Sequence, residues 1–215
     1  MENGAACVSF ASGLAAATQV FQSLKSGDHI LIPDDTYFSI RSILDQMFGA
    51  FGISYTLADM TNHAAVENSI QPNTVIIWIE TPSNPSLKVT DIEAIVSIAK
   101  KHNCFTVADN TWATPFYTRP TDLGVDITLH STTKYLGGHS DILGGALIFK
   151  ETNERYERIR AFQKLGGAVP SPYDCWLLCR SLATFAARMP IHSANAMQLA
   201  QYLEAHPKIE RVLYP

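Results

Sequence analysis

The sequence has no apolar run that could cross a bilayer and no concentration of like charges. A membrane-spanning helix needs about 18 to 20 consecutive apolar residues, and the 215-residue chain contains no such run. It carries 16 Lys and Arg against 20 Asp and Glu, for a formal net charge of -4. Nucleic acids and anionic membranes bind a basic patch or stripe, so we expect neither as a partner. The N-terminus MENGAACVSF lacks the pattern of a targeting signal, so we expect a cytoplasmic location.

Cysteine is scarce and scattered, which argues against a metal site. The four cysteines are Cys7, Cys104, Cys175 and Cys179, and only the last two are close in sequence. No CxxC pair or matching histidine cluster accompanies them. We therefore expect buried free thiols and no bound metal.

Short apolar segments alternate with longer helical segments along most of the chain. Segments as apolar as VIIWIE and CFTVAD are typical of strands covered by helices on both faces, and the alternation favours parallel pairing. The predicted strands are Ala6–Phe10, His29–Pro33, Ile53–Leu57, Val75–Glu80, Cys104–Ala108, Asp126–His130 and Gly145–Phe149, and the predicted helices are Leu14–Lys25, Ile40–Phe48, Ala64–Ile70, Ile92–His102 and Asn153–Lys164. The sequence thus predicts an α/β domain with a mainly parallel, seven-stranded sheet flanked by helices.

The C-terminal part of the chain has a helical pattern. Apolar residues recur at helical spacing from Ser171 to His206, and we expect the helix to be broken at Pro190. We predict a large domain over residues 1–190 and a helical connection toward another domain over residues 191–215.

Polar residues follow five of the predicted strands. They are Ser12-Gly13, Asp34–Tyr37, Asn84, Asp109–Thr111 and Ser131–Lys134. Because ligands of open α/β sheets collect beyond the carboxyl ends of the strands, we predict that these five loops form the site.

Lys134 and Asp109 are the residues in these loops with the most distinctive chemistry. A buried lysine loses its proton more readily and can attack a carbonyl carbon to form an imine. The hydroxyls beside it, from Ser131 and Thr133, can donate to a phosphate. Asp109 could pair with a protonated ring nitrogen and so help a ring accept electrons. A solvated lysine and a capping or ion-paired aspartate are the alternatives.

The other loops offer groups that suit a flat, phosphorylated ligand. The glycine of Ser12-Gly13 permits close approach, and the helix that follows presents free N–H groups to an anion. Tyr37 could stack on a ring or exchange a proton, and Asn84 could donate to a phenolic oxygen. Glu80 is expected to orient its neighbours. An interface aromatic and an ordinary turn asparagine remain alternatives.

A hydrolytic triad is disfavoured. His139, Ser140 and Asp141 are consecutive, whereas triad members come from separate elements, and no GxSxG elbow is present. We expect a structural loop there.

Together, these segments resemble the cysteine/methionine-metabolism family of pyridoxal-phosphate enzymes, which includes cystathionine γ-lyase, γ-synthase and β-lyase. The segments that carry the resemblance are FASGLAA at 10–16, DDTY at 34–37, WIETPSNP at 78–85, VADNTWATP at 107–115, HSTTKYLGGHSD at 130–141 and GAVPSPYDCWL at 167–177. The resemblance implies a fold-type I transferase-like domain, pyridoxal 5'-phosphate as cofactor, a small amino-acid substrate and a homotetramer.

The resemblance also implies a role for each candidate residue. Lys134 would hold the cofactor as a Schiff base and shuttle protons, and Asp109 would pair with the pyridine nitrogen. The phosphate would be bound by Gly13 and Leu14 through their N–H groups, and by Ser131 and Thr133 through their hydroxyls. Tyr37 would stack on the ring, and Asn84 would address its 3-hydroxyl.

Three departures from the family pattern bear on the active site. The family's N-terminal segment and C-terminal domain bring a tyrosine and arginines to the active site, and this sequence has no counterpart of either, so we expect a fragment. Phe38 and Ser39 stand where close γ-lyases tend to have glycines, and the arginine that follows, Arg41, is one position early. Trp112 is seen in β-lyase-like members, while other motifs favour the γ-lyase and γ-synthase branch. We expect a lyase or synthase of sulfur amino acids of the γ type, with a β-lyase or a catalytically incomplete, cofactor-binding fragment as alternatives.

Overall fold

The computed structural model describes residues 1–215 and contains one seven-stranded sheet. The strands are β1 (Ala6–Phe10), β2 (His29–Pro33), β3 (Ser54–Ala58), β4 (Thr74–Glu80), β5 (Phe105–Asp109), β6 (Ile127–Ser131) and β7 (Gly145–Phe149), in the spatial order β1-β7-β6-β5-β4-β2-β3. Only β7 runs antiparallel to its neighbours, so β1 points the same way as the other five. The prediction of a mainly parallel, seven-stranded sheet is confirmed, and each predicted strand boundary lies within one residue of the observed one.

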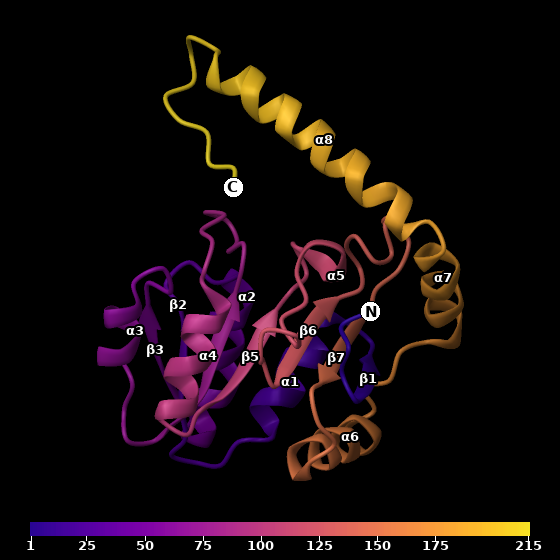
Figure 1. Cartoon of the computed structure of the whole chain (residues 1–215). Helices are drawn as coiled ribbons and strands as arrows, with labels where there is room; N and C mark the ends of the chain where they lie inside the picture. The colour runs from indigo at the N-terminus through magenta and orange to yellow at the C-terminus, as the bar shows by residue number, and fades with distance from the viewer.

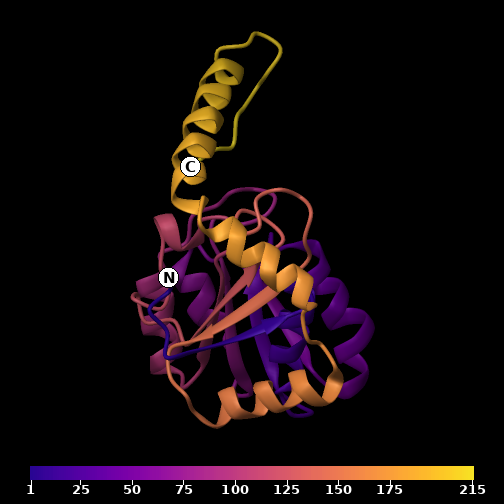
Figure 2. The same ribbon diagram turned by 90° about the vertical axis from the view of Figure 1, so that its right-hand side faces the viewer.

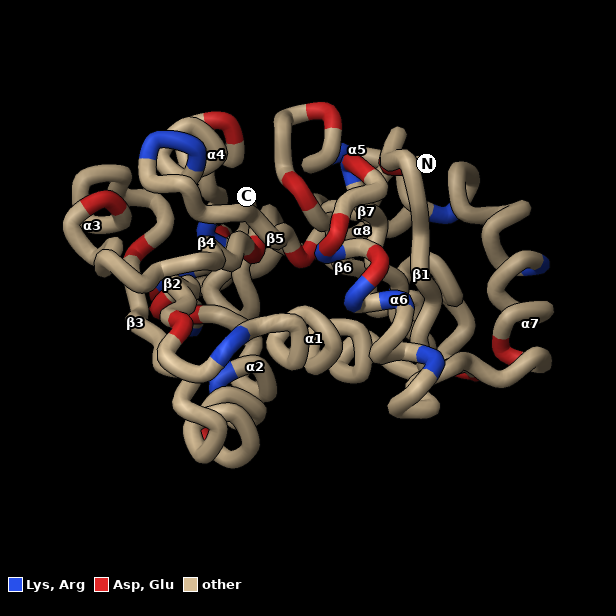
Figure 3. The backbone as a smooth tube through the Cα atoms, turned by 90° about the horizontal axis from the view of Figure 1, so that it is seen from below, with Lys and Arg blue, Asp and Glu red and all other residues tan.

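Helices cover both faces of the sheet (Figure 3). One face carries α1 (Gly13–Gln22), α2 (Phe38–Ile43) and α6 (Glu154–Gly166), and the other carries α3 (His63–Asn68) and α4 (Ile92–Lys101). Each face closes over its own cluster of buried apolar side chains. Basic and acidic residues are interspersed along the backbone, with no face of one sign in this view.

Five of the helices, α1, α3, α4, α6 and α7 (Pro172–Leu182), start where a polar side chain caps the first turn. Ser12 Oγ accepts a hydrogen bond from the N–H of Ala15 at 3.0 Å, and Asp91 Oδ1 accepts one from Ala94 at 3.0 Å. Such caps satisfy N–H groups that have no partner within the helix. Helix α4 then buries Ile92, Ile95, Val96 and Ala99, the spacing of a single apolar stripe.

The prediction for the C-terminal helices was wrong in one respect. The helices there are α7 (Pro172–Leu182) and α8 (Phe185–Glu204), and α8 continues through Pro190. The break falls at Ala183–Thr184 instead. Proline removes one N–H, which leaves the carbonyl of Ala186 without its helical donor, and because Ala186 is exposed, water can bond that carbonyl. The predicted boundary between residues 190 and 191 lies inside α8 and stays a prediction.

Two smaller elements, the short helix α5 (Thr114–Tyr117) after β5 and the 3-10 turn η2 (Gly49–Phe51), were not predicted. The predicted helix Ile40–Phe48 consists of α2 and a π-helical turn, η1 (Leu44–Phe48). Helix α8 projects from the body of the molecule, and the last residues turn back toward the body (Figures 1 and 2). Its attachment is a small cluster in which Phe185 and Met189 contact Leu136. No helix combines the length and hydropathy needed to cross a membrane.

Trp78, in the central strand β4, is the largest fully buried side chain and gives a test of the core. It packs against Phe21 of α1 with ring centroids 5.4 Å apart. We expect Trp78→Ala to lower the free energy of unfolding by about 3 to 5 kcal/mol, because it removes a buried aromatic ring and leaves a cavity. Denaturant unfolding followed by circular dichroism measures this change.

The matched control is Trp176→Ala, since the Trp176 side chain is 58% exposed. We expect that substitution to change the unfolding free energy by less than about 0.5 kcal/mol. Equal losses for the two variants would contradict the placement of Trp78 in the core.

Candidate active site

The five predicted loops lie along one edge of the sheet. Strands β1, β2, β4, β5 and β6 run in the same direction, so their carboxyl ends meet at that edge. The sheet order therefore places the loops in a row: Ser12-Gly13, Ser131–Lys134, Asp109–Thr111, Asn84 and Asp34–Tyr37. Strand β7 enters from the same edge, between the first two loops.

The N-terminus of α1 and the end of β6 form a close-packed cradle. A Cβ placed on Gly13 would lie 2.8 Å from Ser131 Cβ and 3.0 Å from its Oγ, and one placed on Gly145 would lie 2.2 Å from the carbonyl oxygen of Ser12. Only glycine fits at either position. Gly13 and Leu14 are the first helical residues, whose N–H groups have no acceptor within α1. Free N–H groups beside the Ser131 hydroxyl suit an anion.

Ser131 also links the cradle to the next two loops. Its N–H donates to Thr111 Oγ1 at 2.8 Å, and its carbonyl accepts from the N–H of Lys134 at 3.3 Å. Thr133 is held by β7, since its Oγ1 accepts from the N–H of Gly144 at 3.1 Å. The hydroxyls of this segment thus lie beside the start of α1.

The Lys134 side chain is exposed and makes no ion pair or hydrogen bond. The burial that we expected to activate its amine is therefore not observed. The reason is its position in the turn after β6, at the open edge of the sheet, where no helix covers it. The amine is free to react with a ligand placed over the row of loops.

Glu80, at the end of β4, ties two of the loops together. Its Oε2 accepts from Thr36 Oγ1 at 2.8 Å and from the N–H of Tyr37 at 2.9 Å, while Oε1 accepts from the N–H of Asn84 at 2.9 Å. The residue is only 3% exposed. Glu80 thus orients its neighbours as the sequence predicted, by fixing the backbone on which Tyr37 and Asn84 stand.

The side chains of Tyr37 and Asn84 remain available. Tyr37 is 40% exposed, and its ring contacts Phe38 edge-on with centroids 6.3 Å apart. Neither the Tyr37 hydroxyl nor the Asn84 amide forms a hydrogen bond within the chain. Both groups can therefore contact a ligand without losing a partner.

Glu80 and Asp109 stand side by side, because they pair in register at the ends of β4 and β5. Burial, together with the negative charge of Asp109, raises the pKa of Glu80 to about 7. Burial also raises the pKa of Asp109, against hydrogen bonds from Thr111, whose N–H donates to Asp109 Oδ1 at 3.0 Å. Two adjacent carboxyl groups make this position favourable for a cationic ligand group.

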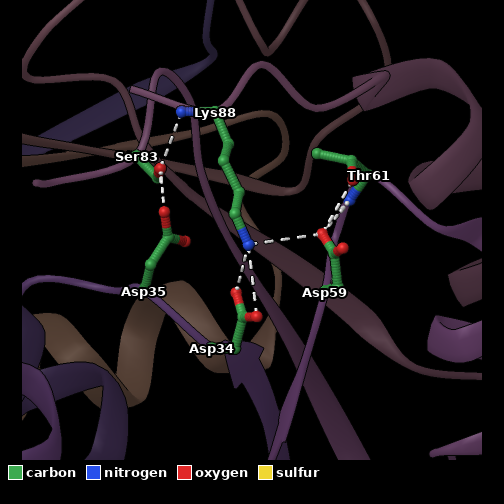
Figure 4. A network of polar contacts seen from close by, with 6 residues as sticks. All are labelled: Asp34, Asp35, Asp59, Thr61, Ser83 and Lys88. Atoms are coloured by element: carbon green, nitrogen blue, oxygen red, sulfur yellow. Dashed lines mark hydrogen bonds and ion pairs between the residues drawn. The ribbon is translucent and has the colours of Figure 1, made fainter. Parts of the chain in front are cut away.

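Asp34 and Asp35, in the same loop as Tyr37, belong to a separate network around Lys88 (Figure 4). Lys88 Nζ lies 3.0 Å from Asp34 Oδ1 and 3.6 Å from Asp59 Oδ1. Ser83 Oγ donates to Asp35 and accepts from the N–H of Lys88. The network ties the loop after β4 to the ends of β2 and β3, and the sequence analysis missed Lys88 because its partners are distant in the chain.

The loop after Lys134 is held by an arginine that the sequence analysis also missed. Arg188 of α8 donates to the carbonyls of Tyr135 at 2.8 Å and Ser181 at 3.2 Å. Gly138 has φ +77°, a left-handed conformation that favours glycine, and a Cβ there would displace the Arg188 guanidinium, 2.1 Å away at Nη1. His139 Nδ1 contacts the carbonyl of Gly137 at 2.8 Å and not Asp141, as expected for a structural loop.

A cavity of about 480 Å³ lies next to the row of loops. Its lining includes Pro82, Trp112 and Tyr135, each close in sequence to a predicted site residue, and His192 of α8. None of the predicted site residues lines it. The row of loops, rather than this cavity, carries the reactive groups.

The chemical groups along the row of loops fit pyridoxal phosphate. The α1 cradle suits a phosphate, Tyr37 suits a flat ring, the acidic pair suits a protonated ring nitrogen, and Lys134 suits an aldehyde. Along the edge these groups occur in the order of the strands that they follow, β1, β6, β5, β4 and β2.

Comparisons with known proteins agree with this fit. The profile of the family described as "Cys/Met metabolism PLP-dependent enzyme" matches residues 1–215. The chain is 46% identical over 206 residues to a probable cystathionine gamma-synthase of Herpetosiphon aurantiacus, covering 96% of this chain and 64% of that protein. It is 44% identical to the cystathionine beta-lyase MetC of Bacillus subtilis, covering 100% of this chain and 55% of that protein.

A solved structure has nearly the same fold. The structure of cystathionine gamma-lyase from Lactobacillus plantarum complexed with L-serine has a TM-score of 0.96 and 42% identity, covering 100% of this chain and 56% of that one. The chain thus spans between 55% and 64% of the length of these relatives. Profile, relatives and structure agree that the chain belongs to the Cys/Met-metabolism family of PLP-dependent enzymes.

Proposed function

We propose that this chain carries the cofactor site of a carbon–sulfur lyase or synthase that acts on cystathionine or a related amino acid. The observation that carries the proposal is the continuous row of contacts at the carboxyl edge of the sheet. It runs from Gly13 through Ser131, Thr111 and Asp109 to Glu80 and its two loops. The row offers, in order, an anion cradle, an amine, an acid and an aromatic face.

Each predicted site residue has a place in this row. Gly13 and Leu14 would bind the phosphate through their N–H groups, and Ser131 and Thr133 would bind it through their hydroxyls. The ring would lie against Tyr37, with Asn84 donating to its phenolic oxygen. Asp109 would hold the proton on the ring nitrogen.

Pyridoxal phosphate, when bound, supplies an aldehyde that condenses with amines and a ring that accepts electrons from the α-carbon of an amino acid. The Lys134 amine would bind the cofactor covalently and, once displaced by substrate, remove the α-proton at its Nζ. Tyr37 could exchange a proton at its hydroxyl. Asp109 would keep electron acceptance favourable by holding the ring nitrogen protonated.

The substrate class and assembly follow from the family and are proposals for this protein. The family acts on small amino acids, and the relatives include a γ-synthase, a β-lyase and a γ-lyase. We favour the γ type, with β-elimination as the alternative that product analysis separates. A homotetramer in the cytoplasm is proposed from the family resemblance.

The experiment that tests the proposal uses Lys134→Ala. The protein is incubated with pyridoxal phosphate and cystathionine, and the keto acid is identified as 2-oxobutyrate for γ-cleavage or pyruvate for β-cleavage. We expect Lys134→Ala to abolish both the visible absorbance of the bound cofactor and keto-acid formation, because no other residue of the row carries an amine.

Lys150→Ala is the matched control, since Lys150 follows β7 at the opposite edge of the sheet. It should keep the absorbance and the turnover of the unaltered protein. Cofactor absorbance without keto acid in the unaltered protein would indicate a catalytically incomplete, cofactor-binding chain. Undiminished absorbance in Lys134→Ala would rule out the assigned lysine.

Glu80 should give the apoprotein a distinctive pH dependence. The pKa of Glu80 is raised from 4.5 to about 7 in the folded protein, so between these values the folded state binds more protons than the unfolded state. The free energy of unfolding should therefore fall as pH rises through this window, by on the order of 3 kcal/mol from Glu80. Denaturant unfolding at several pH values measures the slope.

Glu80→Gln should reduce that slope. It should also lower the free energy of unfolding by an amount that does not depend on pH, because its hydrogen bonds are altered. The slope, not the absolute stability, is the test. Glu157→Gln, at an exposed position of α6, should leave the slope unchanged. A slope in Glu80→Gln as steep as in the unaltered protein would show that Glu80 does not titrate in this window.

A further inference from the structure

Lys134 is placed by its backbone alone. Its side chain is exposed and has no ion-pair or hydrogen-bond partner within the chain. A lysine amine stands at the end of a flexible stem, so the region that Nζ can reach is set by the turn that carries the residue, residues 132–138. Whatever fixes this turn therefore fixes where the amine can meet a ligand.

The N-terminal half of the turn is held from the sheet. The N–H of Thr132 donates to the Gly144 carbonyl at 2.9 Å, and the N–H of Gly144 donates to Thr133 Oγ1 at 3.1 Å. Just before the turn, the N–H of Ser131 donates to Thr111 Oγ1 at 2.8 Å. The two hydroxyls that we assign to the phosphate thus belong to the part that the segments next to β5 and β7 fix.

The C-terminal half of the turn is held by Arg188 of α8. The N–H of Gly138 donates to the Lys134 carbonyl at 2.7 Å, and no backbone N–H donates to the next two carbonyls, those of Tyr135 and Leu136. Arg188 Nη1 donates to the Tyr135 carbonyl at 2.8 Å, and Nη2 makes a longer contact of 3.5 Å with that of Leu136. A cation at the last carbonyls of a helical turn is a C-terminal cap. Arg188 thus caps the turn that carries Lys134.

The guanidinium group is itself fixed on its other side. Arg188 Nε donates to Thr184 Oγ1 at 3.1 Å, and Nη2 donates to the carbonyl of Ser181, near the end of α7, at 3.2 Å. Gly138 leaves the space that the guanidinium occupies, since a Cβ there would lie 2.1 Å from Nη1. Each guanidinium nitrogen therefore has a partner, and the cap holds the turn in one place relative to α7 and α8.

Attachment of α8 does not explain this arrangement by itself. Phe185 and Met189 are 4% and 3% exposed and already pack on Leu136 at the base of the helix. Such apolar contact has no preferred direction, whereas hydrogen bonds to carbonyls are directional. The guanidinium therefore orients the turn beside Lys134, in addition to any part in attaching the helix.

We propose that Arg188 is a positioning residue for Lys134, which caps the turn and so holds the amine where it can bond the aldehyde of the cofactor. The inference rests on the proposed function, since it needs Lys134 to bind pyridoxal phosphate covalently. In that step the Nζ lone pair adds to the aldehyde carbon, and a carbon–nitrogen double bond replaces the carbon–oxygen one. The oxygen leaves as water with the two protons of the neutral amine. Arg188 acts through the backbone of the turn and not on the reacting atoms.

The test compares two ligands in calorimetric titrations of the apoprotein. One is pyridoxal phosphate, and the other is 4'-deoxypyridoxine phosphate, in which a methyl group replaces the aldehyde. We expect Arg188→Met to weaken pyridoxal phosphate binding about tenfold, the effect of losing one hydrogen bond from a charged group. The analogue forms no bond to Lys134, and its phosphate uses the half of the turn that the sheet holds, so its affinity should fall less than about twofold. A purely structural role would weaken both ligands alike.

Two further variants keep the test decisive. Arg188→Lys keeps the positive charge but not the planar fork of donors, so it should show the same selectivity with a smaller loss, about threefold. It also serves in the case that Arg188→Met does not fold. The matched control is Arg180→Met, since Arg180 is an exposed arginine of α7, and it should leave both affinities unchanged.

Equal losses for the two ligands, or undiminished pyridoxal phosphate affinity in both Arg188 variants, would overturn the inference. Failure of the unaltered protein to bind pyridoxal phosphate would instead overturn the proposed function. The two failures are distinguishable because the second is seen before any residue is changed.

Discussion

The shared direction of the five strands that precede the site loops determines where everything else in the site can lie. Because β1, β2, β4, β5 and β6 point the same way, their carboxyl ends meet at one edge, and segments as distant as Gly13 and Ser131 come into contact. The antiparallel β7 interrupts this order, and its glycines allow the first two loops to approach across it. The sheet thereby builds a row of reactive groups from segments that are individually unremarkable in sequence.

Charge is the second organising feature of that row. Glu80 and Asp109 are adjacent acids, and a protonated ring nitrogen would reduce their repulsion. On the other face of the sheet, Glu2 Oε1 lies 2.7 Å from His130 Nε2, and both side chains are buried. In this interpretation the apoprotein tolerates unfavourable electrostatics that the cofactor removes, as expected for a site built for binding rather than for stability.

The strands and the five loops could be predicted from the sequence because both are local signals: apolar runs bounded by turns, and polar residues just after them. The features that were wrong or missed depend on distant contacts or solvent. Helix α8 passes through Pro190 because the freed carbonyl is exposed, and Lys134 is exposed because no helix covers its turn. Glu2 and His130 are 128 residues apart, and no local pattern links them.

The central claim is that the row of loops, rather than the neighbouring cavity, holds the cofactor. A crystal structure of the protein with pyridoxal phosphate tests it most directly. We predict density continuous with Lys134 Nζ, the phosphate at the N–H groups of Gly13 and Leu14, and the ring nitrogen opposite Asp109. Cofactor density in the cavity lined by Trp112 and Tyr135, or attached to another lysine, would contradict the account.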